Sequence, residues 1–124
     1  MYADTDFFVA LAKPSDWLKH NAKLIHQQYK GNIDTSIATY IEIAFVALRI
    51  NLDPLYAILG VLKICNHTNL VPIRAGQLIK KGVGVLDAFH AANCDGEIIS
   101  SDHIYDTIGI KRIKLENPVE KGEN

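Results

Sequence analysis

The sequence predicts an α/β protein: a three-layer α/β/α sandwich built on a parallel sheet of four to five strands. Short apolar strand candidates alternate with helical patterns along the whole chain. This alternation is typical of parallel sheets, because parallel neighbours are joined by crossover helices. The 124 residues are 48% hydrophobic, which is enough for one core. We therefore expect one domain over residues 1–115, followed by a polar, mobile tail over 116–124.

Composition narrows the class of protein. A formal net charge of −1 with 22% charged residues argues against both disorder and a generic basic nucleic-acid binder. No apolar run approaches the ~18 residues that a membrane span needs, and the first residues lack the basic start of a signal peptide. The two cysteines lie in separate segments and fit reduced thiols better than a disulfide. We expect a cytoplasmic protein without membrane contact.

The opening segment, Met1 to Phe8, is the first informative stretch. Tyr2 and Ala3 are interpreted as the end of a short buried strand, which leads to Asp4 and Asp6. Acidic side chains are seldom buried unless they are paired or hold a cation. An acid at the carboxyl end of a core strand also lies where open α/β sheets bind ligands. Asp4 is therefore a candidate ligand-binding acid if other acids of the chain converge on it.

A second acid stands inside a long helix. After a short helix or turn at 7–13, a helix is expected from Pro14–Ser15 to about Lys30, then a strand at 33–36. The helix from 36 to 50 is apolar nearly all round, so we expect it to be buried, with Glu42 as its isolated acid. The polar face of the 14–30 helix is interpreted as solvated surface, or alternatively as a phosphate-facing edge; it carries Lys19, His20, Lys23, His26 and Lys30.

The middle of the chain continues the alternation. Asp53 and Pro54 predict the cap and first residue of a helix. A strand is expected at 69–73 and a short helix at 74–81. The segment from Gly84 to Asn93 reads as a helix with Asp87 near its start. His90 shares a face with Asp87, but one histidine beside an acid lacks the further nitrogen or sulfur ligands of a zinc site.

The last acid follows a strand. Residues 97–100 form the expected strand, and Ser101 and Asp102 then show helix-cap chemistry. Asp106 lies four residues beyond Asp102. Residues 111–115 alternate basic and apolar side chains, as an edge strand does.

Four acids can therefore converge: Asp4, Glu42, Asp87 and Asp102. Strand ends and the following helix starts share one edge of a parallel sheet, and Glu42 can reach that edge from the flank. Bare carboxylates at ~4 Å would repel by roughly 4 kcal/mol per pair at an effective dielectric of about 20. A divalent cation removes this cost, and all-oxygen ligands favour Mg²⁺ or Mn²⁺. The purely structural alternatives are a Glu42 at the helix edge, an Asp87 favoured by the helix dipole and an Asp102 that only caps.

These motifs together resemble the PIN-domain family, in particular the small VapC-type toxins. Tyr-Ala-Asp4-Thr-Asp6 is similar to the family's opening strand and Asp-Thr, and Glu42 to its mid-chain glutamate. Leu-Asp87-Ala-Phe-His-Ala-Ala resembles its Asp-Ala helix. Ser101-Asp102 with a following Tyr-Asp106 resembles its last strand end. The resemblance covers residues 1 to about 115; Asp6 departs from it, because the family usually has Asn or Ser there.

The resemblance implies Mg²⁺- or Mn²⁺-dependent endoribonuclease activity, a homodimer and, for a toxin, a small antitoxin partner. Its metal ligands would be Asp4, Glu42, Asp87 and Asp102. Asp6 and Asp106 would be accessory acids, and Ser101 would orient the site by hydrogen bonding. Five basic residues are weak candidates for contacts with RNA: Lys13, Lys80, Lys81, Lys111 and Arg112.

Two other functions stay open. A non-catalytic PIN-like module would bind RNA or a protein with an idle acid pocket. Asp4-Thr5-Asp6 also resembles the opening of haloacid-dehalogenase-type phosphatases, in which the first Asp is a nucleophile. That reading needs a supporting Lys and usually a cap insertion, for which 124 residues leave little room.

Overall fold

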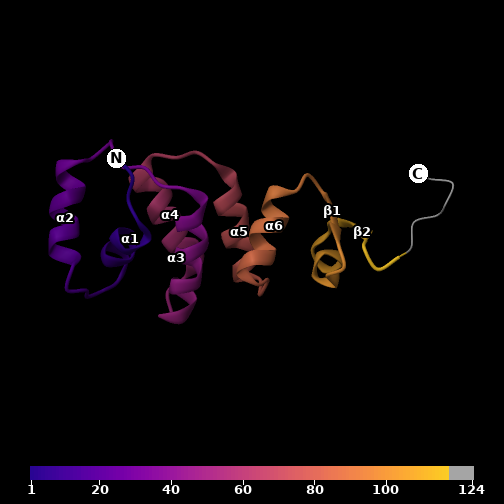
Figure 1. The fold of residues 1–124 in the computed structure, drawn as a ribbon. Coiled ribbons are helices and arrows are strands. Elements are labelled where there is room, and N and C mark those ends of the chain that lie inside the picture. Colours follow the sequence, from indigo (N-terminus) through magenta and orange to yellow (C-terminus); the bar gives the residue numbers. More distant parts are fainter. Residues whose placement is uncertain (118–124) are drawn as a thin grey trace.

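The computed structural model describes residues 1–117 (Figure 1). The expected tail over 116–124 falls outside the described residues from 118 onward. The elements are α1 (Thr5–Ala12), α2 (Lys19–Gln28), α3 (Ile37–Arg49), α4 (Pro54–Cys65), α5 (Leu70–Lys80), α6 (Val85–Asn93), β1 (Glu97–Ser100), the 3₁₀ helix η1 (His103–Ile108) and β2 (Lys111–Lys114).

The elements are arranged in a row, in an order close to that of the sequence except that α2 lies outside α1. Figure 1 shows α2 at one end, α1, α3 and α4 next, then α5 and α6, and finally β1, η1 and β2. We call residues 97–117 the C-terminal unit. It lies beyond α6, on the side of the helices opposite to the chain's N-terminus. No helix within residues 1–117 combines the length and the apolar character that crossing a bilayer requires.

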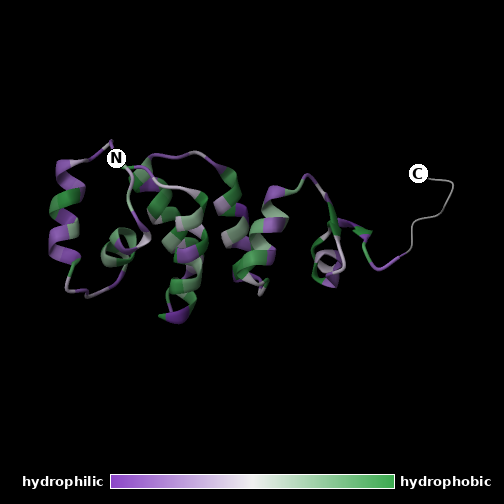
Figure 2. Cartoon of the chain, viewed as in Figure 1, coloured by the Kyte–Doolittle hydropathy of each residue, from purple (hydrophilic) through white to green (hydrophobic). Residues whose placement is uncertain are grey.

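The core lies between the helices. Phe8 of α1, Ile43 of α3, Ile58 of α4, Ala75 of α5 and Phe89 of α6 are all buried in one cluster. The hydropathy of the helices follows their distance from this core. In Figure 2, α2 at the margin is more hydrophilic than α3 in the centre. The thiols are unpaired, as expected: Cys65 is buried and Cys94 is partly buried, and both are free.

One glycine permits a close contact between α4 and α5. A Cβ on Gly76 of α5 would stand 3.2 Å from the backbone Cα of Leu55 and 2.9 Å from its Cδ1. Backbone cannot give way as a flexible side chain can, so a side chain at position 76 would push α4 and α5 apart.

Three predictions about helices are corrected. The 14–30 helix begins only at Lys19, because the Asp16 side chain accepts from the backbone N–H of Leu18 and forms a turn there. The strand expected at 69–73 is wrong: Asn69 caps α5 through the N–H of Val71, and Pro72 is tolerated in the first turn. Helix α3 is not buried all round, since Phe45 and Leu48 are 43% and 50% exposed.

The sheet is smaller than expected. β1 and β2 pair in parallel, with Glu97 opposite Lys111, and Tyr2 makes an isolated parallel bridge to Asp34. The parallel orientation is confirmed, and the α/β class holds. The prediction of four to five strands in one sheet is wrong for residues 1–117, which form a two-stranded sheet. The reason is spatial: the Tyr2 segment and β1 lie on opposite sides of the helices (Figure 1), so they share no ladder within the chain.

Candidate functional site

Asp4 begins helix α1. Its backbone is extended, and its Oδ1 accepts a 2.6 Å hydrogen bond from the backbone N–H of Thr5. The carboxylate therefore satisfies one of the free N–H groups at the start of the helix while remaining exposed. Asp6 lies in the first turn and is also exposed, where the helix dipole favours an acid. Asp4 is thus the N-cap of α1 and stays open to solvent.

Glu42 is connected to the same residue. The buried Thr5 side chain donates from Oγ1 to Glu42 Oε1 at 3.1 Å and lies 3.3 Å from Thr39 Oγ1. Asp4 and Glu42, which we call the N-terminal acid pair, therefore both bond to Thr5. Glu42 is exposed, so the expectation of a buried Glu42 is wrong. Its helix α3 turns a partly solvated face outward at this position.

A chain of threonine hydroxyls supports this pair. Thr35 Oγ1 lies 2.6 Å from Thr39 Oγ1 and 3.0 Å from the carbonyl oxygen of Ala3. The hydroxyls therefore link the Tyr2 segment, α3 and the start of α1 through Thr5. Thr39 is 1% exposed, so these polar groups depend on one another for their hydrogen bonds. Sequence reasoning missed this network, although three threonines close to Asp4 and Glu42 were a visible signal.

Asp87 and Asp102 form a second group, the C-terminal acid pair. Asp87 is in the first turn of α6, as predicted, and accepts a 3.5 Å hydrogen bond from the Tyr105 hydroxyl. Asp102 caps η1 through the N–H of Ile104. Burial raises the pKa of Tyr105, and the nearby charges of Asp87 and Asp102 add to this effect. Tyr105, only 3% exposed, therefore bonds to Asp87 and lies within electrostatic range of Asp102.

Ser100, not Ser101, makes the local hydrogen bond. The Ser100 hydroxyl accepts from the backbone N–H of Asp102 at 2.9 Å, whereas the side chain of Ser101 is exposed. Ser100 is thus a site neighbour that sequence reasoning missed, and Tyr105, quoted only as part of the Tyr-Asp106 motif, was given no role of its own. Their signal was position alone, two residues before and three residues after Asp102.

Arg112 has an internal role. Its side chain is 1% exposed and donates to Asp106, to Glu116 at 2.7 Å and to the carbonyl of Ser100 at 2.9 Å. Hydrogen bonds from Arg112 lower the pKa of both Asp106 and Glu116. Arg112 is therefore engaged within the chain and its RNA contact stays a prediction, while Asp106 is engaged with Arg112 and His103.

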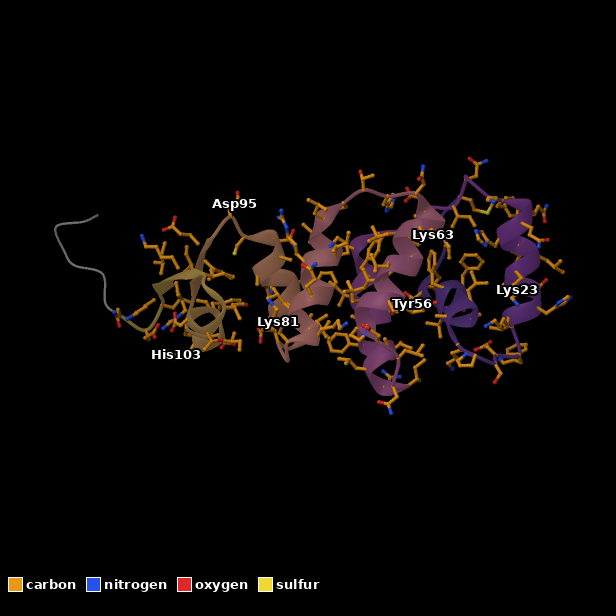
Figure 3. All side chains as sticks on the ribbon, turned by 180° about the vertical axis from the view of Figure 1, so that it is seen from behind. Lys23, Tyr56, Lys63, Lys81, Asp95 and His103 are labelled. Atoms are coloured by element: carbon orange, nitrogen blue, oxygen red, sulfur yellow. The ribbon has the colours of Figure 1, made fainter. Side chains whose placement is uncertain are left out.

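The candidate lysines differ in their surroundings. Lys13 lies 3.8 Å from Asp16, and Lys80 and Lys111 each lie 3.3 Å from an acid, Asp53 and Glu97 respectively. Lys81 is exposed at the end of α5, and Figure 3 places it on the side of the helices that faces the C-terminal unit. Paired surface lysines lose little when they exchange an acid for a phosphate, but they add little net positive charge.

Comparison with protein families matches residues 1–106 to the PIN domain. This range contains all four candidate acids, each within the motif that carries the resemblance. The chain belongs to the PIN-domain family. PIN domains have an α/β fold and are generally metal-dependent nucleases, typically with Mg²⁺ or Mn²⁺. Comparisons with curated proteins and with solved structures returned no match.

The donor chemistry of this PIN domain suits a divalent cation, but its geometry as one chain does not. The four acids supply only oxygen, as Mg²⁺ and Mn²⁺ prefer. Within residues 1–117, however, no three His, Cys, Asp or Glu side chains gather closely enough to hold an ion. The acids instead stand as two pairs, one around Thr5 and one around Tyr105. A single copy therefore does not bring the four candidate acids together.

Proposed function

We propose that this PIN domain is a Mg²⁺- or Mn²⁺-dependent endoribonuclease that cleaves RNA phosphodiester bonds. In this proposal Asp4, Glu42, Asp87 and Asp102 are the metal ligands. A divalent ion bound to them would activate a water molecule and offset charge on the phosphate.

The observation that carries the proposal is the extent of the family match. It runs from residue 1 to residue 106 and so includes the first acid, the last acid and both between. Local structure agrees with a binding role, since each acid pair has a fixed hydroxyl neighbour. Thr5 donates to Glu42, and Tyr105 donates to Asp87. Hydrogen-bonded neighbours of this kind orient metal ligands and tune their affinity.

RNA is the proposed substrate, with the exposed Lys81 as the first candidate contact and Lys13, Lys80 and Lys111 as weaker ones. The proposed biological role is the toxin of a VapBC-type pair, inhibited by a small antitoxin. A cell-growth assay tests this role directly. Induced expression of the parent should arrest growth, and expression of Asp87→Asn should not.

Activity is tested with purified protein, a mixed-sequence RNA and Mn²⁺. The parent should cut the RNA internally, EDTA should stop cutting, and Asp4→Asn and Asp87→Asn should each lower the rate by at least about a hundredfold. Asp53→Asn is the matched control, because Asp53 also caps a helix and Asn keeps the cap. It should cut like the parent.

Two outcomes would reject the proposal. Equal cutting by the parent and both Asn variants would assign the activity to a contaminant. RNA binding without cutting, at any Mn²⁺ or Mg²⁺ concentration, would instead favour the non-catalytic binding module. Trapping of a phosphate on Asp4 would favour the haloacid-dehalogenase-type phosphatase.

A further inference from the structure

We propose that two copies of this chain pair reciprocally, with β1 of each copy adding as a parallel strand to the Tyr2 edge of the other. Each joint then brings the N-terminal acid pair of one copy to the C-terminal acid pair of the other. The dimer holds two composite sites, and one copy alone holds none. The catalytic meaning of these sites rests on the proposed function, whereas the strand pairing itself does not.

The first observation is an open strand edge at Tyr2. The N–H of Ala3 donates to the carbonyl of Asp34, and the N–H of Asp34 donates to the carbonyl of Met1. Alternate residues of a parallel strand bond to the same neighbour, so the N–H and C=O of Tyr2 point to the opposite side. Among residues 1–117 they have no backbone partner. An open edge of this kind is a template for a further strand.

The second observation is a matching open edge on β1. The carbonyls of Gly96 and Ser100 accept from Lys111 and Leu115, which places these groups on the β2 side. The N–H and C=O groups of Glu97 and Ile99 therefore point to the other edge, where no described strand lies. Both open edges belong to parallel pairings, so a parallel addition of β1 to the Tyr2 segment would continue both.

The third observation is apolar surface at the same two places. Met1 and Tyr2 are 67% and 63% exposed, and Ile99 of β1 is 65% exposed. Strands of parallel sheets are ordinarily covered on both faces. Exposed apolar side chains on both open edges are therefore the surface that a joint between them would cover.

The partner is a second copy because the chain's own C-terminal unit already contacts α6 and the helical core on the far side of the helices. Its Tyr105 bonds to Asp87 of α6, and its Ile104 and Ile108 pack against the helical core. Figure 1 shows α3, α4, α5 and α6 between the Tyr2 segment and β1. Pairing within one chain would detach these contacts and separate Asp87 from Tyr105. Pairing between two elongated copies, side by side and antiparallel, keeps every contact and closes with twofold symmetry.

The strand joint is tested by mass in solution, measured by light scattering after size exclusion. The parent should be a dimer. Ile99→Pro removes the N–H on the open edge of β1, and Tyr2→Pro removes the N–H on the open edge of the Tyr2 segment. Both variants should be folded monomers. Lys114→Pro is the matched control, because its N–H faces the outer edge of β2, and it should remain dimeric. A monomeric parent, or dimers that survive both edge prolines, would overturn the proposal.

Composite sites are tested by mixing two inactive variants. In a mixed dimer of Asp4→Asn and Asp102→Asn, one site carries both substitutions and the other carries neither. Co-refolded in equal amounts, the variants should regain about a quarter of the parent activity, because half of the dimers are mixed and each has one intact site. Each variant refolded alone should stay inactive.

The two experiments separate the two proposals. If the parent cuts RNA and the mixture shows no recovery, the acids of each site come from one chain and the exchange is wrong. If the parent does not cut RNA, the proposed function fails, and the mass measurements with the proline variants still decide whether the strands exchange.

Discussion

The hydroxyl of Thr5 donates a 3.1 Å hydrogen bond to a carboxylate oxygen of Glu42, while the backbone N–H of the same residue donates to Asp4. One residue therefore orients two candidate ligands that lie 38 positions apart in the sequence. Only the hydroxyl part of this arrangement depends on the Thr5 side chain. The two functions can be separated by substitution.

Thr5→Val removes the bond to Glu42 and leaves the backbone bond to Asp4. We expect about a tenfold to hundredfold loss of Mn²⁺ affinity or cutting rate, as for other neighbours of metal ligands. Thr5→Ser keeps the hydroxyl and should stay within a few-fold of the parent. Mn²⁺ titrations and single-turnover cleavage measure the two quantities. Equal losses in the Val and Ser variants would show that the methyl packing of Thr5, and not its hydroxyl, is what matters.

Thr39→Val tests the hydroxyl network by stability. Thr39 is 1% exposed and lies within hydrogen-bond distance of Thr5 and Thr35. Removing a buried hydrogen-bond partner should lower the free energy of unfolding by about 1–2 kcal/mol. Thr107→Val, at an exposed position, should change it by less than about 0.5 kcal/mol. Urea unfolding followed by circular dichroism makes the comparison, and equal effects at the two sites would contradict a buried network.

Asp102 combines a cap and a candidate ligand. Asn can accept the same bond from the N–H of Ile104, whereas Ala cannot. Asp102→Asn should therefore abolish cutting at nearly parent stability, and Asp102→Ala should also lose about 1 kcal/mol of stability. Thermal unfolding and RNA cleavage measure the two effects. If Asp102→Asn cuts RNA like the parent, Asp102 is not a metal ligand and its role is limited to capping η1.

The Arg112 cluster predicts a pH dependence. Arg112 holds the pKa of Asp106 and Glu116 below their usual values. Stability from these pairs is therefore fully present above the unfolded carboxyl pKa of roughly 4, and it is lost as the pH falls through the lower folded values. The melting temperature of Arg112→Met should lie well below that of the parent at pH 7 and approach it at pH 3.

Lys111→Met is the control for this comparison. Lys111 pairs with Glu97 on the surface, where ion pairs contribute little. Its melting temperature should follow that of the parent at every pH. A difference between Arg112→Met and the parent that is constant from pH 3 to pH 7 would assign the effect to lost packing instead of charge.

Local features were predictable because short stretches of sequence carry their cause. Asp53 and Pro54 start α4, Asp87 lies in the first turn of α6, and β2 is an edge strand of a parallel pair, all as expected. Helix caps and alternation patterns act over a few residues. The exception, a helix at 70–80 in place of a strand, also has a local cause, since Asn69 caps it.

By itself, the sequence determined the family, the parallel α/β class and the four acids in their motifs. Only the tertiary structure decided that Arg112 is internal, that Glu42 is exposed and that the acids stand as two pairs around Thr5 and Tyr105. The physical reason is range. A cap or a strand pattern is set by neighbours in sequence, whereas the meeting of distant carboxylates depends on which strand edges pair, and apolar strands can pair equally well within one chain or between two.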